Sequence, residues 1–221
     1  DRHSHAKIAI MVGLVMGLHA TIYWITADVH VQAQDFITYL PVSALYIASM
    51  IFGYVGLRYL ELSIVAPLQN SSGAITVLLL LFFFPKDITW VHITGFVFIL
   101  AGILWLAFIE KKYDDIELRR KGIQVDTKYR YGFIALIFPL LYALLDGVGS
   151  FADGVVLDEL ALIKEGPAII AYEYTWFAVA VVYFIYLKAK GVDFKIREQK
   201  NGGIAAVLET AGQFFYTYAM A

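Results

Sequence analysis

The chain has 221 residues, of which 60% are hydrophobic and 16% are charged, with a formal net charge of −2 at pH 7. Soluble domains average about 45–50% apolar and about 25% charged residues, so this composition excludes a soluble globular domain and predicts an integral membrane protein. No basic patch carries the aromatic spacing of a nucleic-acid-binding groove. Cysteine is absent, which excludes disulfides and thiolate metal ligands.

Seven apolar segments follow one another along the chain, each long enough to cross the roughly 30 Å hydrocarbon core as a helix. They cover about 7–27, 36–59, 61–84, 89–109, 131–156, 167–189 and 203–221. The predicted fold is therefore an all-α, polytopic membrane bundle of about seven transmembrane helices. Because the chain starts with Asp1 and stops inside an apolar run, we expect it to be part of a longer protein.

The distribution of Lys and Arg predicts the orientation of these helices. Fifteen of the 17 basic residues lie at the start, at Arg58, and in the two charged loops 110–130 and 188–200. The opposite side holds only Lys86 and Lys164. Since basic loops stay in the cytoplasm, the two charged loops are predicted to be cytoplasmic, in the plasma membrane (inner membrane) of a prokaryotic cell.

The first segment contains a small-residue motif and one histidine. Gly13 and Gly17 form a GxxxG motif, which predicts close packing against another helix. His19 lies about 18 Å above the cytoplasmic side at about 1.5 Å per residue. A lone histidine on an apolar face is more often a hydrogen-bonded core residue, so His19 is the weakest of the proton-carrying candidates.

The third segment, 61–84, has a polar midsection. Pro67 removes one helical hydrogen bond and loosens the helix beside a run of polar and small residues. That run is Gln69, Asn70, Ser71, Ser72 and Gly73. Because unpaired polar groups are costly in lipid, the run must face protein or a water-filled cavity, and a broken spanning helix is typical of a transporter's substrate site. The alternative is polar contact between packed helices.

Acidic residues mark the last three segments. Asp146 and Asp153 are seven residues apart on one helical face, while Glu173 and Glu209 belong to the two following segments. Intramembrane carboxylates pair, protonate or line water, which makes them functional candidates. No intramembrane Lys or Arg accompanies them in the predicted spans, so a cavity that they line would favour cations or protons over anions.

Depth separates the four acids. Asp146 and Glu173 both lie roughly 20 Å above the cytoplasmic side, where they could meet and where burial and repulsion would favour a proton on one of them. Asp153 lies higher, and a solvated helix end is the favoured interpretation there. Glu209 is about six residues into its helix from the cytoplasmic side. It is interpreted either as a gate residue or as an ordinary interfacial acid.

Enzyme and cofactor motifs are absent. The sequence lacks GxxxxGK[ST], HExxH and GxSxG, so it predicts neither ATP hydrolysis, zinc-dependent hydrolysis nor a serine hydrolase. An aspartate dyad needs two carboxylates that share a proton, whereas Asp146 and Asp153 are about 10 Å apart along one helix. We therefore predict no enzyme activity, no cofactor and no metal site.

Three stretches carry a resemblance to a known family. The second segment ends in YVGLRYLELS (Tyr54 to Ser63), the next begins with Ala66 and Pro67, and a glycine-containing helix, ITGFVFILAGILWL, covers 93–106. This pattern resembles the EamA-like family of the drug/metabolite transporter (DMT) superfamily over about half of the chain, at moderate specificity. The turn PKD at 85–87 departs from the LGE-like sequence common in that family.

The resemblance implies ten helices arranged as two inverted five-helix repeats. Residues 1–110 would then be helices two to five, 111–130 a cytoplasmic linker, and 131–221 the truncated helices six to eight. It also implies a secondary active transporter for a small metabolite or drug-like molecule, possible coupling to protons, and alternating access by one half rocking against the other. A passive channel, or a structural or assembly protein of the bilayer, is the alternative.

The predicted site residues fall into three groups. The residues expected to contact the substrate are Gln69, Asn70, Ser71, Ser72, Asp146 and Glu173. The proton-coupling candidates are Asp146, Glu173, Glu209 and His19. The expected hinge residues are Pro67, Gly147 and Gly149.

Overall fold

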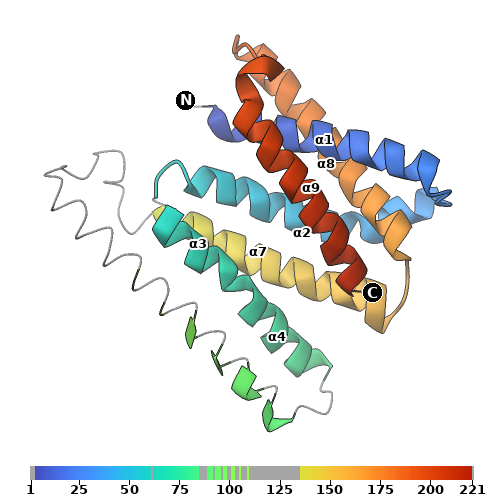
Figure 1. The fold of residues 1–221 in the computed structure, drawn as a ribbon, viewed down its shortest axis with the longest axis vertical. Coiled ribbons are helices and arrows are strands. Elements are labelled where there is room, and N and C mark those ends of the chain that lie inside the picture. Colours follow the sequence, from blue (N-terminus) through green and yellow to red (C-terminus); the bar gives the residue numbers. More distant parts are fainter. Residues whose placement is uncertain are drawn as a thin grey trace, which may run out of the picture. The chain divides into compact units, whose positions relative to one another are not determined.

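A computed structural model describes residues 3–60, 62–84, separate positions between 89 and 109, and 135–220 (Figure 1). Throughout this part of the chain the regular structure is helical, without a strand. The helices are α1 (Ser4–Thr26), α2 (Ala33–Gly56), α3 (Leu62–Asn70), α4 (Ser72–Phe83), α7 (Ile137–Gly154), η2 (Val155–Glu159), α8 (Glu165–Ala189), η3 (Ile196–Gln199) and α9 (Lys200–Met220). The predicted all-helical class is confirmed.

Among the described residues, five stretches are long and apolar enough to cross a membrane. They are Ser4–Thr26, Ala33–Gly56, Val65–Phe83, Ile137–Glu159 and Glu165–Ala189. Five of the seven predicted segments are thereby confirmed as candidate spans, and the protein is a helical membrane protein. Nine of the 21 residues of the predicted span 89–109 lie outside the described residues. The predicted span 203–221 corresponds to α9, a helix of 21 residues that is more polar than the five.

The chain forms two compact units. Unit 1 combines Asp1–Ile47 with Ala152–Ala221, and unit 2 is Ala48–Phe151. Helices α2 and α7 contribute residues to both units, which are described separately below. The predicted repeat halves divide the chain differently and stay a prediction, and the predicted linker 111–130 lies outside the described residues.

Unit 1 is built around α1, which packs along α8 and α9. The GxxxG motif of α1 is the point of closest approach to α8. A Cβ added to Gly13 would lie 2.5 Å from the Trp176 carbonyl oxygen and 2.5 Å from the Ala180 Cβ, and one added to Gly17 would lie 2.7 Å from Phe177. Only glycine leaves room for these contacts, so the predicted packing role of the motif is confirmed.

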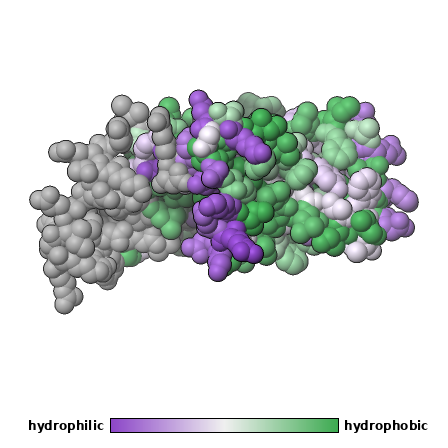
Figure 2. All heavy atoms as spheres, turned by 90° about the horizontal axis from the view of Figure 1, so that it is seen from above, coloured by the Kyte–Doolittle hydropathy of each residue, from purple (hydrophilic) through white to green (hydrophobic). Residues whose placement is uncertain are grey.

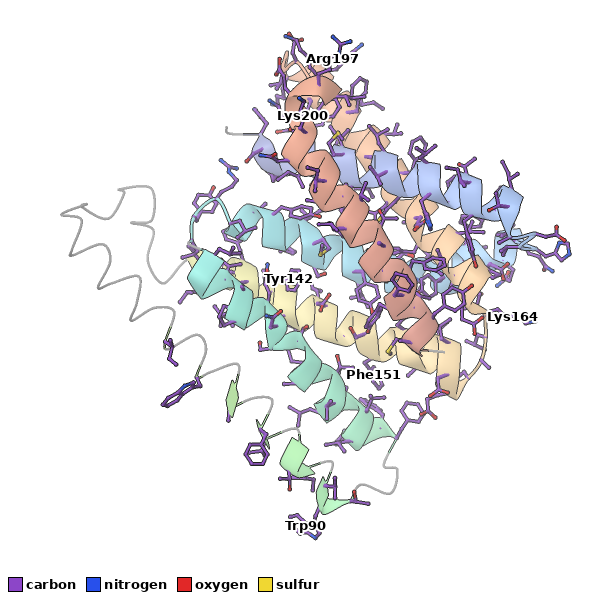
Figure 3. All side chains as sticks on the ribbon, viewed as in Figure 1. Trp90, Tyr142, Phe151, Lys164, Arg197 and Lys200 are labelled. Atoms are coloured by element: carbon purple, nitrogen blue, oxygen red, sulfur yellow. The ribbon has the colours of Figure 1, made fainter. Side chains whose placement is uncertain are left out.

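Unit 2 joins the end of α2 to α3, α4 and α7. A Cβ added to Gly53 would lie 2.7 Å from the Gln69 side-chain nitrogen and 2.8 Å from the Tyr142 ring. Tyr142 and Phe151 both belong to α7 (Figure 3), and the Phe151 ring packs 5.5 Å from that of Phe83. Glycine and aromatic side chains therefore hold these helices together.

Large apolar side chains also lie on the outside of the protein. On the face drawn in Figure 2, hydrophobic residues cover much of the described surface. Ile25, Phe82 and Phe215 are 77%, 79% and 70% exposed. Apolar areas of this extent are unfavourable in water but favourable in the acyl region of a bilayer, as expected for membrane-spanning helices.

Candidate functional site

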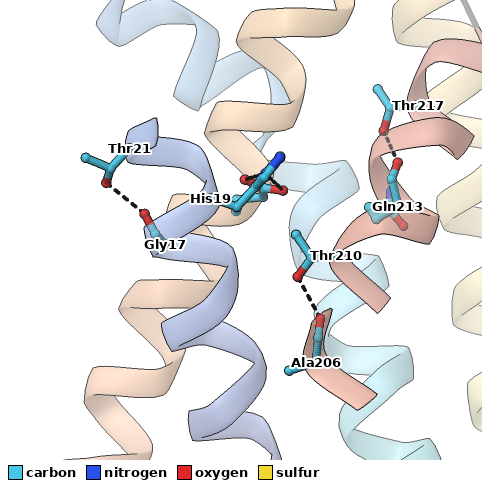
Figure 4. A network of polar contacts seen from close by, with 8 residues as sticks. Gly17, His19, Thr21, Ala206, Thr210, Gln213 and Thr217 are labelled. Carbon is cyan, nitrogen blue, oxygen red and sulfur yellow. Dashed lines mark hydrogen bonds and ion pairs between the residues drawn. The ribbon is translucent and has the colours of Figure 1, made fainter. Parts of the chain in front are cut away.

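An acid–base contact of unit 1 joins α1 to α8. His19 Nδ1 lies 2.8 Å from each carboxylate oxygen of Glu173 (Figure 4). The Glu173 side chain is fully buried, whereas that of His19 is 34% exposed. Glu173 shares a helical face with Trp176 and Phe177, the two residues that face the GxxxG glycines. The close approach of the helices therefore brings the pair together.

Aromatic rings enclose the histidine. The Tyr23 ring is stacked on the imidazole at 5.9 Å between centroids, and the Phe214 ring meets it edge-on at 5.6 Å. These rings limit the orientation of the imidazole and reduce its contact with solvent. A charged carboxylate is costly in such surroundings unless it is paired, and a histidine can supply that pairing charge. The pair is therefore able to hold or exchange one proton between its members.

A second acidic cluster of unit 1 surrounds Asp153. The Tyr39 hydroxyl donates a 2.5 Å hydrogen bond to Asp153 Oδ1, and the Tyr46 hydroxyl lies 3.3 Å from Oδ2. The Tyr46 and Tyr216 hydroxyls are 3.2 Å apart, so the network extends to α9. Asp153 is completely buried. The expectation of a solvated helix end was wrong, because Tyr39 and Tyr46 of α2 replace water as hydrogen-bond donors to this carboxylate.

The helix changes its geometry directly after Asp153. Helix α7 ends at Gly154, and a π-helix continues over Val155–Glu159. A π-helix has i→i+5 hydrogen bonds, so it is wider than an α-helix, and such segments are frequent at functional sites. Two residues beyond it, Ala161 has a φ of 45°, a conformation that costs a non-glycine residue about 1 kcal/mol or more. The span that contains α7 therefore departs from α-helical geometry directly after the buried Asp153.

The predicted break in the third segment is present in unit 2. Helix α3 ends at Asn70 and α4 begins at Ser72. The Ser71 hydroxyl donates a 2.6 Å hydrogen bond to the Leu68 carbonyl oxygen, which stabilises the break locally. Pro67 lies inside α3, one turn before the break, and its missing N–H removes one helical hydrogen bond.

The break lies against the acidic residue of α7. The Asp146 carboxylate accepts hydrogen bonds from the hydroxyls of Ser72 and Ser49, and Ser49 is fully buried. Thr76 donates a 3.0 Å hydrogen bond to the Gly147 carbonyl oxygen, so α4 and α7 are joined on both sides of the acid. Polar residues of the midsection and one membrane carboxylate thus form a single cluster in unit 2.

The predicted site residues are therefore distributed over both units. Asp146 belongs to unit 2 and Glu173 to unit 1, so their predicted meeting stays a prediction. Asn70 is exposed, and Glu209 is half-buried on α9, where both of its interpretations stay open. Gly147 lies within α7, and a Cβ there would be 2.7 Å from the Ser72 carbonyl oxygen. This close contact with α4 explains why the position is a glycine, and the hinge role of Gly147 stays a prediction. Gly149, the other predicted hinge, is buried in the same helix.

Sequence reasoning missed the hydroxyl partners of the acids. Tyr39 and Tyr46 of α2 are seven residues apart, a spacing that places them on one helical face. This pattern was visible in the sequence, but each tyrosine was counted there as an apolar residue. Among the described residues, no group of three or more His, Cys, Asp or Glu side chains could hold a metal ion.

Comparisons with known proteins match the chain to no family model, no curated protein and no solved structure.

Proposed function

We propose that the protein is a proton-coupled secondary active transporter for a small metabolite or drug-like molecule, of the DMT type, in the plasma membrane of a prokaryotic cell. The observation that carries the proposal is the His19–Glu173 pair, in which two spanning helices meet at a fully buried carboxylate. Ionisable residues inside the membrane are costly, and they are retained in proton relays and ion pathways.

The chemistry of the pair suits proton coupling. With one proton between them, carboxylate and imidazole form a neutral unit, either as an ion pair or as an acid beside a neutral histidine. Loss of that proton leaves an uncompensated negative charge in a low-dielectric site, which is strongly unfavourable. Release is therefore expected only in a conformation that admits water to the pair, and such a requirement links the proton to alternating access.

The substrate site is proposed in unit 2. Between α3 and α4 the Ser71 N–H bonds to the Leu68 carbonyl oxygen, three residues back, so the α-helical hydrogen-bond pattern is interrupted within a membrane span. Such an interruption is tolerated where protein or a water-filled cavity surrounds it. Gln69, Asn70 and Ser72 flank the break, and Asp146 adds an acidic group. These residues would bind a polar small molecule. Bending of the helices at Pro67, Gly147 and Gly149 would let that molecule reach the site from either side of the membrane.

The test uses the purified protein in liposomes that contain a pH-sensitive dye. A panel of amino acids, nucleosides and organic cations is applied under an imposed pH gradient. The expected result is saturable uptake of at least one class, accompanied by proton movement. Glu173→Gln should abolish the proton movement, because an amide cannot exchange a proton. Asp146→Asn should abolish pH-driven uptake as well.

Glu165→Gln is the matched control, since Glu165 lies in the first turn of the same helix. Full proton-coupled uptake in both Glu173→Gln and Asp146→Asn would contradict the proposal. Flux that neither saturates nor couples to protons would identify a channel instead, and the absence of flux for every class would favour a structural or assembly role.

A further inference from the structure

A cavity of about 510 Å³ lies in unit 1 between the starts of α1 and α9. Its polar lining comes from three elements: Ser4 and Lys7 of α1, Arg197 and Glu198 of η3, and Lys200 and Asn201 of α9. The cavity belongs to neither acidic cluster, and the transport proposal does not use it. Its volume is within the range of small-molecule sites in proteins.

The charge of the cavity is positive. Three basic side chains line it, against one acid. That acid, Glu198, is engaged by Lys195 at 3.4 Å. In the described part of the chain, Arg197 and Lys200 form no ion pair; Arg197 lies in η3 and Lys200 begins α9 (Figure 3). Two cations without acidic partners beside a concave surface favour an anion. The guanidinium of Arg197 can bind two phosphate oxygens at once, and Ser4 and Asn201 add neutral hydrogen-bond donors.

The position of the cavity favours a lipid as the source of that anion. Ser4 begins the first membrane span, so the cavity lies at the level where a span enters the headgroup region. Next to the lining residues, Ile196 and Ile204 are 60% and 63% exposed. Exposed apolar side chains beside a basic cavity suit a ligand that has both a phosphate and acyl chains. Basic pockets at the ends of membrane helices are the sites where anionic headgroups bind.

We propose that this cavity binds the phosphate of an anionic phospholipid headgroup. Arg197, Lys200 and Lys7 neutralise the phosphate, and the exposed isoleucines contact the upper part of the acyl chains. A free phosphate ion shares the same headgroup chemistry, so the experiment separates these two sources.

The experiment measures lipid binding to the purified full chain in detergent by native mass spectrometry and by thermal unfolding. The probes are phosphatidylglycerol, phosphatidylcholine and inorganic phosphate. We expect phosphatidylglycerol to bind and to raise the unfolding temperature, and phosphatidylcholine to do neither. The double variant R197Q/K200Q should bind phosphatidylglycerol about tenfold to thirtyfold more weakly. Each cation near an anionic headgroup contributes about fivefold in affinity, and the variant removes two of them.

Lys190→Gln is the matched control, because Lys190 is exposed at the end of α8 and does not line the cavity. Unchanged binding in R197Q/K200Q, or an equal loss in Lys190→Gln, would overturn the proposal. Displacement of phosphatidylglycerol by an equal concentration of inorganic phosphate would overturn the lipid assignment and leave a phosphate site.

Discussion

His19 Nδ1 lies 2.8 Å from both carboxylate oxygens of Glu173, so a residue of α1 and a residue of α8, separated by 154 positions in sequence, form one partly buried acid–base pair. The pair lies beside the closest contact of the two helices, where Gly17 meets Phe177. Helix packing and proton chemistry are thereby located at the same level of unit 1.

The first prediction concerns the stability of this pair. His19→Ala should lower the free energy of unfolding by about 1–3 kcal/mol, because it leaves a buried carboxylate without its partner. In the background of Glu173→Gln, which has no charge to compensate, the same change should cost less. Thermal unfolding of the four proteins of this double-mutant cycle in detergent measures the coupling. Strictly additive losses would mean that the pair contributes no interaction energy.

The second prediction concerns the hydroxyl groups around Asp153. Tyr39→Phe keeps the ring but removes the 2.5 Å hydrogen bond, so it should destabilise the protein by about 1–3 kcal/mol. Tyr46→Phe should cost less, because its hydroxyl lies 3.3 Å from the carboxylate. Tyr186, 42% exposed on α8, supplies the control Tyr186→Phe, which should be near neutral in the same unfolding assay. Equal effects of Tyr39→Phe and Tyr186→Phe would disprove the buried network.

The third prediction tests the close packing of α1 and α8. Gly13→Ala places a methyl group 2.5 Å from the Trp176 carbonyl oxygen, so it should cost about 1–3 kcal/mol through displaced helices. Gly212→Ala is the matched control, since nothing lies within 4 Å of its added Cβ. There the higher helix propensity of alanine should leave stability unchanged or raise it by up to about 1 kcal/mol. If both variants unfold alike, the helices are not in contact at Gly13.

The fourth prediction separates two neighbouring serines at the break in the third segment. Ser72 donates to Asp146, whereas the Ser71 hydroxyl is occupied by the Leu68 carbonyl oxygen. Ser72→Ala should therefore change the KM for a transported substrate severalfold, because it alters the acidic cluster. Ser71→Ala should leave KM nearly unchanged, while it lowers stability slightly. The reverse ranking in saturation kinetics would assign the substrate contact to Ser71.

The fifth prediction concerns membrane orientation. Since the chain has no cysteine, a single introduced cysteine can be labelled without background. Lys164→Cys at the start of α8 should react with a membrane-impermeant maleimide in intact cells, and Lys190→Cys at its end should react only after permeabilisation. Labelling of Lys190→Cys in intact cells would reverse the predicted topology.

The sequence alone determined the features that depend on local composition. Apolar length predicted the five candidate spans that the structure contains, and Pro67 followed by polar residues predicted the break between α3 and α4. The spacing of Gly13 and Gly17 predicted a close helix contact. These features are encoded over one or a few helical turns, so no long-range information is needed to read them.

The tertiary structure decided which polar groups meet. Glu173 pairs with His19, Asp153 with Tyr39, and Asp146 with Ser72, and every one of these partners lies at least 70 positions away in the chain. Sequence reasoning ranked His19 last and placed Asp153 in solvent, because depth along a helix says nothing about which neighbouring helix covers that level. A buried carboxylate needs a donor, and the packing of the helices decides which residue provides it.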